Sequence, residues 1–270
     1  MKYKIAAALI ACSAFSVHAA NVAFFNNPAF VDVAQEGLNL RTSLVSGGHT
    51  VSDITGSALA DFNTGLSGKT ILVIPELQNG DLAAALDAPT RAAIANFVSA
   101  GGTVQVHGGT TPNDVNFLNG VFGYTIATNN YASGPSTKTA AAAGTPFASG
   151  PASLTSNSAT TQVAAAALPA GAKSIYSPDG GTNSVMFTVP NGTGQVIFMG
   201  WDWFGAPPQA TADGGWLALA SLVSTASATP GGVTPGASTA SIPTLSEWGL
   251  IFMSSILAMV GISRMRRRQR

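Results

Sequence analysis

The chain has 270 residues, and only 9% of them are Asp, Glu, Lys or Arg, against roughly 25% in an average soluble protein. Seven of the twelve basic residues lie at the two ends, so residues 21–223 hold eleven acidic and five basic side chains and carry a net charge of about −6. Proteins that bind nucleic acids need basic surfaces to displace counterions. The composition therefore argues against nucleic-acid binding, and the length allows one or two domains.

The N-terminus has the three parts of a secretory signal peptide. A charged start is followed by the apolar run Ile5–Val17, and Val17 and Ala19 place small side chains at the −3 and −1 positions of a cleavage site. We predict a signal peptide over residues 1–19, with cleavage after Ala19 or, nearly as well, after Ala20. The predicted partners are the Sec translocon and signal peptidase.

Two other interpretations of this segment are weaker. A permanent membrane anchor needs about 20 apolar residues, and the run has 13. A lipoprotein box at Leu9–Cys12 leaves an apolar core of only seven residues. Because Cys12 is the only cysteine, its removal with the signal peptide leaves the exported protein without a thiol or a disulfide.

Residues 20–223 alternate between apolar runs and helical patterns, which predicts an α/β domain. Predicted strands cover 22–25, 49–54, 69–75, 103–106, 122–127, 184–189 and 195–199. Predicted helices cover 31–46, the segment from Asp87 to the Gly101–Gly102 pair, and 214–223. The alternation predicts a parallel sheet with right-handed crossovers and helices on both faces.

The second half of the domain is less regular. Residues 133–167 are rich in Ala, Ser, Thr and Gly, which predicts loops with short strands. Asn191–Gly192 separates two predicted strands, and Asn-Gly favours a tight hairpin because both residues tolerate positive φ. We therefore expect an irregular, β-rich second half.

Two segments of this domain resemble a known family: Ile71–Glu76 together with Ile94–Val104, and Gly194–Asp202. They are similar to class I glutamine-amidotransferase-like, flavodoxin-like domains, including trehalose-utilisation-type members. The resemblance implies a flavodoxin-like fold. Active amidotransferases place a nucleophilic Cys on a tight turn after a strand and pair it with a downstream His. Here the predicted strand 103–106 leads to His107, no Cys is present and no His follows, so the family's catalytic residues do not carry over.

Ligands of open α/β sheets gather beyond the carboxyl ends of the strands. The predicted strands place Asn26, Glu76, His107 and Asp202 there, as a possible pocket. Paired carboxylates and a histidine can do acid–base work or hold a metal, but each is as readily a capping or structural group. No phosphate-binding, nucleophile-elbow or metal-spacing motif is present, so no catalytic residue, metal or cofactor is predicted.

An aromatic group follows the last predicted strand: Trp201, Trp203 and Phe204, with Trp216 further along the chain. Such a group can stack on carbohydrate, but tryptophan is usually well buried. We predict that it closes the core.

The composition of the last 47 residues predicts a linker followed by a membrane segment. Residues 224–241 consist of Ser, Thr, Pro, Gly and Ala with a single Val, which predicts a flexible linker. Residues 248–263 are uncharged and predict a short transmembrane helix. The basic residues after it predict a cytoplasmic anchor: Arg264, Arg266, Arg267 and Arg268.

The order of parts over residues 242–270 resembles the IPTL-CTERM sorting signal, a variant of the PEP-CTERM signals of Gram-negative bacteria. The motif residues are Ile242, Pro243, Thr244, Leu245, Trp248 and Gly249. The resemblance implies recognition by an exosortase-family membrane transpeptidase, cleavage near the motif and transfer to the cell surface or exterior. An ordinary C-terminal anchor predicts the helix but not the Ile-Pro-Thr-Leu sequence before it.

The predicted function is therefore that of an exported, non-enzymatic surface or matrix protein with a binding or structural α/β domain. One option for its partner is an extracellular polysaccharide. The alternative is a divergent hydrolase or carbohydrate-active enzyme that uses Glu76, His107 and Asp202. A third option is a periplasmic binding module whose membrane tether is never cut.

Overall fold

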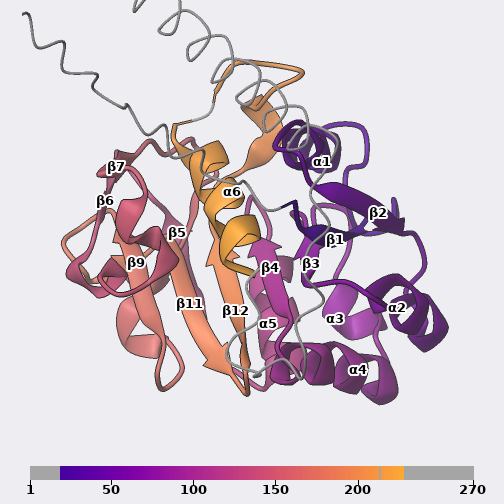
Figure 1. The fold of residues 1–270 in the computed structure, drawn as a ribbon. Helices are drawn as coiled ribbons and strands as arrows, with labels where there is room; N and C mark the ends of the chain where they lie inside the picture. The colour runs from indigo at the N-terminus through magenta and orange to yellow at the C-terminus, as the bar shows by residue number, and fades with distance from the viewer. Residues whose placement is uncertain (1–18, 213, 228–270) are drawn as a thin grey trace, which may run out of the picture. The chain divides into compact units, whose positions relative to one another are not determined.

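The computed structural model describes residues 19–212 and 214–227, which form a nine-stranded mixed sheet, a three-stranded sheet and the helices around them (Figure 1). The large sheet has the order β2-β1-β3-β4-β12-β11-β9-β6-β7. Its first five strands run parallel: β2 (Thr50–Ile54), β1 (Asn21–Phe25), β3 (Ile71–Ile74), β4 (Thr103–His107) and β12 (Gly194–Met199). The order of these five is the 2-1-3-4-5 order of flavodoxin-like doubly wound sheets, in which the switch point lies between the first and third strands.

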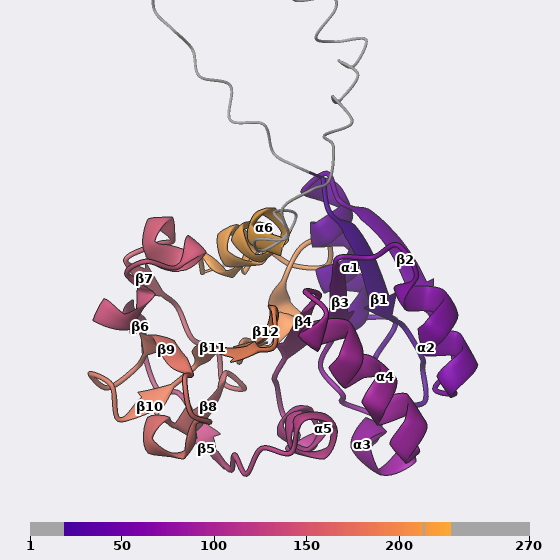
Figure 2. The same cartoon turned by 60° about the horizontal axis from the view of Figure 1, so that its bottom comes forward.

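Helices cover both faces of the parallel strands, as predicted (Figure 2). One face packs against α1 (Glu36–Ser46) and α6 (Trp216–Ser227), through a core that includes Leu40 and Leu219. The other face packs against four helices: α2 (Leu59–Leu66), α3 (Leu82–Ala85), α4 (Ala88–Ser99) and α5 (Asn113–Phe122). The inner strands β1 and β3 are nearly continuous apolar runs because they are buried on both faces, whereas the edge strand β2 is mostly exposed.

The second half of the domain is β-rich and mostly antiparallel. It extends the large sheet through β11 (Met186–Asn191), β9 (Lys173–Ser177), β6 (Ser136–Lys138) and β7 (Ser153–Leu154). The small sheet contains β5 (Thr128–Tyr131), β8 (Thr161–Ala164) and β10 (Asn183–Ser184). Short 3-10 turns join some of these strands: η1 (Ala140–Ala142), η2 (Pro146–Ser149) and η3 (Ala165–Ala167). A fourth, η4 (Trp203–Gly205), lies between β12 and α6.

Two local signals do what the sequence predicts. The Asp87 carboxylate caps α4 by accepting a hydrogen bond from the Thr90 amide at 2.8 Å, with Pro89 in the first turn. The predicted hairpin joins β11 to β12 as an antiparallel pair, with Gly192 at φ of 60°. Its two-residue loop is Gly192–Thr193, because Asn191 pairs with Gly194 at the end of β11 and does not adopt a positive φ.

Four predictions need correction. Residues 122–127 are not a strand, since Phe122 ends helix α5 and β5 begins only at Thr128. The first helix begins at Glu36 rather than at residue 31, because residues 27–35 form turns. Helices α2 and α5 were not predicted. The closing helix runs to Ser227, so the first four residues of the predicted linker are helical.

No helix among residues 19–212 and 214–227 is long and apolar enough to span a bilayer. The predicted transmembrane helix at 248–263 lies outside the described residues, as do residues 1–18 of the signal peptide, the rest of the linker, the sorting motif and the arginine anchor.

Candidate functional site

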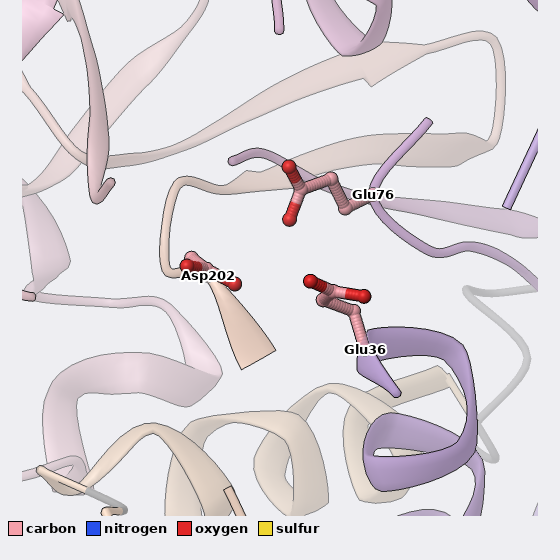
Figure 3. A group of neighbouring side chains, drawn as sticks. All are labelled: Glu36, Glu76 and Asp202. Atoms are coloured by element: carbon pink, nitrogen blue, oxygen red, sulfur yellow. The ribbon is translucent and has the colours of Figure 1, made fainter. Parts of the chain in front are cut away.

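Three carboxylates meet at the carboxyl edge of the parallel strands (Figure 3). Glu36, Glu76 and Asp202 each bring one carboxylate oxygen within 4.8 Å of the others, and their side chains point toward one another. We call these three residues the carboxylate cluster. They are 4%, 1% and 9% exposed, so the cluster is closed off from bulk water.

The topology explains how residues so distant in sequence meet. Glu36 opens α1, which follows β1, and Glu76 lies two residues beyond β3, so both carboxylates lie at the switch point. Asp202 follows β12 and caps η4, because its Oδ1 accepts a hydrogen bond from the Phe204 amide at 2.8 Å. The side chain of Asn39, one turn after Glu36 in α1, donates to the Trp203 carbonyl at 2.9 Å and so holds η4 against α1.

The turn after β4 makes room for Glu76. A Cβ at Gly109 would lie 1.8 Å from the carboxyl carbon of Glu76, so only glycine lets this carboxylate lie against the turn. The next residue then anchors it: Glu76 Oε1 accepts hydrogen bonds from the Thr110 amide at 2.6 Å and the Thr110 hydroxyl at 3.0 Å. The turn therefore holds one oxygen of Glu76 and leaves the other for the cluster.

Burial raises the pKa of every member of the cluster, and the charges of nearby carboxylates raise those of Glu36 and Glu76 further. Burial, the Asp202 charge and, more weakly, the Glu36 charge raise the pKa of Glu76 to about 7 against the Thr110 hydrogen bonds. Burial raises the pKa of Asp202, and burial with nearby acidic groups raises that of Glu36. In the described part of the chain, the only salt bridge joins Arg41 to Asp53, so no basic side chain neutralises these carboxylates.

Asp114 is a fourth buried carboxyl close to this region. Its pKa is raised well above the usual value by burial and by the charge of Glu76. Its Oδ1 accepts a hydrogen bond from the Leu77 amide at 2.8 Å, which joins α5 to the loop after β3. Asp114 thus supports the segment that carries Glu76 without belonging to the cluster.

His107 takes part in the core rather than in the cluster. Its Nδ1 accepts a hydrogen bond from the Trp203 indole at 2.8 Å, and its Nε2 lies 2.7 Å from the side-chain amide of Gln105. The ring is fully buried, and burial lowers its pKa to about 3. The imidazole is therefore neutral at physiological pH, with both nitrogens engaged.

Comparison with known proteins identifies one motif. Residues 240–267 match the IPTL-CTERM motif. The match covers only the C-terminal tail and does not reach the α/β domain. No curated protein matches the chain.

Solved structures with a similar fold are distant in sequence. The mmIFT52 N-terminal domain has a TM-score of 0.51 at 11% identity, over 74% of this chain and 93% of that one. Two cytoplasmic proteins of Salmonella typhimurium, STM3548 and STM1381, have TM-scores of 0.49 and 0.48 at 11% and 13% identity. The two matches cover 77% and 78% of this chain, and they cover 97% and 100% of the Salmonella chains. At 11% identity the likeness to the mmIFT52 domain concerns the fold alone.

The four residues of the predicted pocket separate into three places. Glu76 and Asp202 meet in the cluster, whereas His107 lies in the core beneath it. Asn26 turns toward β2, where its amide donates to the Asp53 carboxylate at 3.3 Å. Glu36 was missed, because the helix predicted from residue 31 places it in the second turn instead of at the start.

Because His107 is neutral in the folded protein, the stability of the fold depends on pH. The unfolded chain binds a proton on this ring near pH 6.5, whereas the folded chain does so only near pH 3. Acidification from pH 7 to 4 should therefore cost the wild type on the order of 3 kcal/mol through this group. The variant His107→Gln should lack this loss, as measured by urea unfolding at several pH values.

The buried carboxyls act in the opposite direction, because their raised pKa values favour the folded state in acid. Both proteins share them, so the difference between wild type and His107→Gln isolates the imidazole. Parallel pH profiles for the two proteins would show that His107 is protonated in the fold.

Proposed function

We propose that this chain is an exported bacterial protein that an exosortase-type transpeptidase cuts at its C-terminal sorting signal. The observation that carries the proposal is the IPTL-CTERM motif at residues 240–267. On this proposal the signal peptide sends residues 20–227 out of the cytoplasm, and the tail holds the precursor in the inner membrane until it is cut. The mature domain then stays at the cell surface or in the extracellular matrix of a Gram-negative bacterium.

We propose further that the α/β domain binds or supports other molecules and does not catalyse a reaction. Its resemblance to amidotransferase-like domains supports this view, because the nucleophilic Cys of active members has no counterpart here. The burial of His107 against Trp203 also supports it, since the imidazole that an acid–base mechanism would use is kept from the carboxylates.

A cavity of about 350 Å³ at the opposite edge of the sheet supports a binding role. It lies where β4 and β12 begin, and its size is within the range of small-ligand sites. Four threonines and a glutamine supply uncharged polar side chains to its lining, and Lys173 is its single charged residue. Such a lining can exchange hydrogen bonds with the hydroxyls of a polysaccharide but offers no carboxylate for acid–base chemistry.

The decisive experiment is to follow the C-terminus in cells. In a Gram-negative host that contains an exosortase-type enzyme, the stable wild-type species should lack Arg264–Arg270 and appear outside the cell. The variant Pro243→Ala should keep its full length and stay in the membrane, because a motif residue is altered. Mass spectrometry of the intact protein and cell fractionation measure both outcomes.

A matched change in the linker provides the control. Pro235→Ala also removes one proline from the tail, but it lies outside the matched motif, so cleavage should proceed as in the wild type. Full-length wild-type chains as the stable species in cells with the enzyme would contradict the proposal.

A further inference from the structure

We propose that the carboxylate cluster of Glu36, Glu76 and Asp202 is a binding site for a divalent cation, specifically Ca²⁺. The inference goes beyond export, and it stands or falls independently of whether the tail is cut. The cluster unites three oxygen donors from three separate segments at the switch point of the sheet.

The first argument is that two of these donors lack partners. Oε2 of Glu36 and Oε2 of Glu76 are fully buried and accept no hydrogen bond from the described part of the chain. A buried carboxylate oxygen without a partner is costly. Both side chains are more than nine-tenths buried and point into the cluster, so a ligand between them would satisfy both oxygens (Figure 3).

The second argument is charge. Three ionised carboxylates in a site closed to water repel one another strongly, and no Lys or Arg among the described residues forms a salt bridge with them. Only a bound proton or a bound cation can relieve that repulsion. A single bound proton still leaves two negative charges in the cluster. A divalent cation balances most of the charge at once.

The third argument concerns which cation fits. The donors are all carboxylate oxygens, without sulfur or imidazole, which favours a hard cation over Zn²⁺ or Cu²⁺. Two Ca²⁺ ligands at 2.3–2.6 Å lie at most about 5 Å apart, and the three oxygens are all within 4.8 Å of one another. Mg²⁺ usually keeps several waters and binds one or two carboxylates, whereas this site offers three with little exposure.

The binding experiment uses the purified full chain, stripped with EDTA and titrated with CaCl₂ by calorimetry. We expect one Ca²⁺ per chain with Kd of roughly 10⁻⁴–10⁻³ M, the range of extracellular modules. At a Ca²⁺ concentration a hundred times Kd, the melting temperature should rise by about 5–10 °C. Tb³⁺ luminescence sensitised by tryptophan gives a second readout, because Trp201 and Trp203 flank Asp202 in the chain, and Ca²⁺ should quench it by competition.

Three variants test the geometry. Glu36→Gln removes one ligand charge and should weaken Ca²⁺ binding at least tenfold. Asp53→Asn removes the same charge from a carboxylate that is salt-bridged to Arg41, and it should change Kd less than twofold. Gly109→Ala removes no charge but pushes the Glu76 carboxyl group away from its place, so it should also weaken binding at least tenfold. Circular dichroism confirms the fold of each variant.

Several results would overturn the proposal. The first is the absence of heat, of a melting shift and of Tb³⁺ luminescence at 10 mM cation. The second is a Glu36→Gln protein that binds as the wild type does, or an Asp53→Asn protein that loses binding equally. Tighter binding of Mg²⁺ than of Ca²⁺ would overturn the assignment to calcium.

Discussion

Replacing Trp203 with alanine is expected to destabilise the domain by about 3–5 kcal/mol, the usual cost of a large cavity in a core. Trp203 is 1% exposed, and its ring packs against Trp201 with centroids 5.0 Å apart. Its indole also donates the hydrogen bond that holds His107, so the variant leaves a buried ring nitrogen without its partner. Urea unfolding monitored by far-ultraviolet circular dichroism measures the loss.

The neighbouring residue is a matched control. Phe204 follows Trp203 in the same short turn, but its side chain is 54% exposed, and Phe204→Ala should change stability by no more than about 0.5 kcal/mol. If Trp203→Ala lost as little stability as Phe204→Ala, Trp203 would not lie in the core. The burial of Trp201, Trp203 and Trp216 confirms that the three tryptophans close the core, whereas the prediction was wrong for Phe204, which is exposed.

The inner strands could be predicted from sequence because their signal is local. Strands β1 and β3 are short apolar stretches buried on both faces, apart from the exposed Asn21 at the start of β1. Strand β4 is equally buried, although Thr103, Gln105 and His107 are polar. Continuous apolar runs are what a parallel sheet between two helical layers requires. The alternation of strands and helices then indicated a parallel sheet with helices on both faces.

Helix α5 shows where local signals fail. Its sequence Asn113–Phe122 contains three Asn and one Gly, which are poor helix formers. The helix forms because Val115, Leu118 and Val121 bury one face against the core. The alternation of Phe122, Tyr124 and Ile126 imitates a strand, but Gly123 adopts φ of 71° and ends the helix there.

The candidate site was half predictable for a similar reason. Glu76 and Asp202 each follow an apolar strand, so their placement at the carboxyl edge could be inferred from position. Glu36 reaches the same edge only because turns in residues 27–35 delay the start of α1. The approach of Glu76 to the β4 turn depends on the missing side chain of Gly109. Such contacts between distant segments leave no local pattern to read.

The second large effect is expected at Gly200, the residue that follows β12. A Cβ at this position would lie 2.0 Å from the Thr161 carbonyl oxygen. The backbone there is fixed on both sides, because the Thr161 amide donates to the Gly200 carbonyl at 2.6 Å and the Gly200 amide donates to the Val185 carbonyl at 2.8 Å. Neither of these backbone segments can move without losing hydrogen bonds. Gly200→Ala should therefore lower the free energy of unfolding by at least about 3 kcal/mol, as measured by urea unfolding.

Gly205, in the same connection after β12, provides a control that distinguishes this clash from the general cost of adding a methyl group. At Gly205 the nearest atom to a new Cβ is the Ala212 side chain at 3.5 Å, an ordinary contact, so Gly205→Ala should leave stability within about 0.5 kcal/mol of the wild type. If Gly200→Ala proved equally harmless, β8 and the end of β12 would have to lie further apart than they do here. Because β12 leads directly to Asp202, such a shift would also move one carboxylate of the cluster. Stability at Gly200 and cation binding at Asp202 therefore depend on the same stretch of backbone, and Gly200→Ala should impair both together.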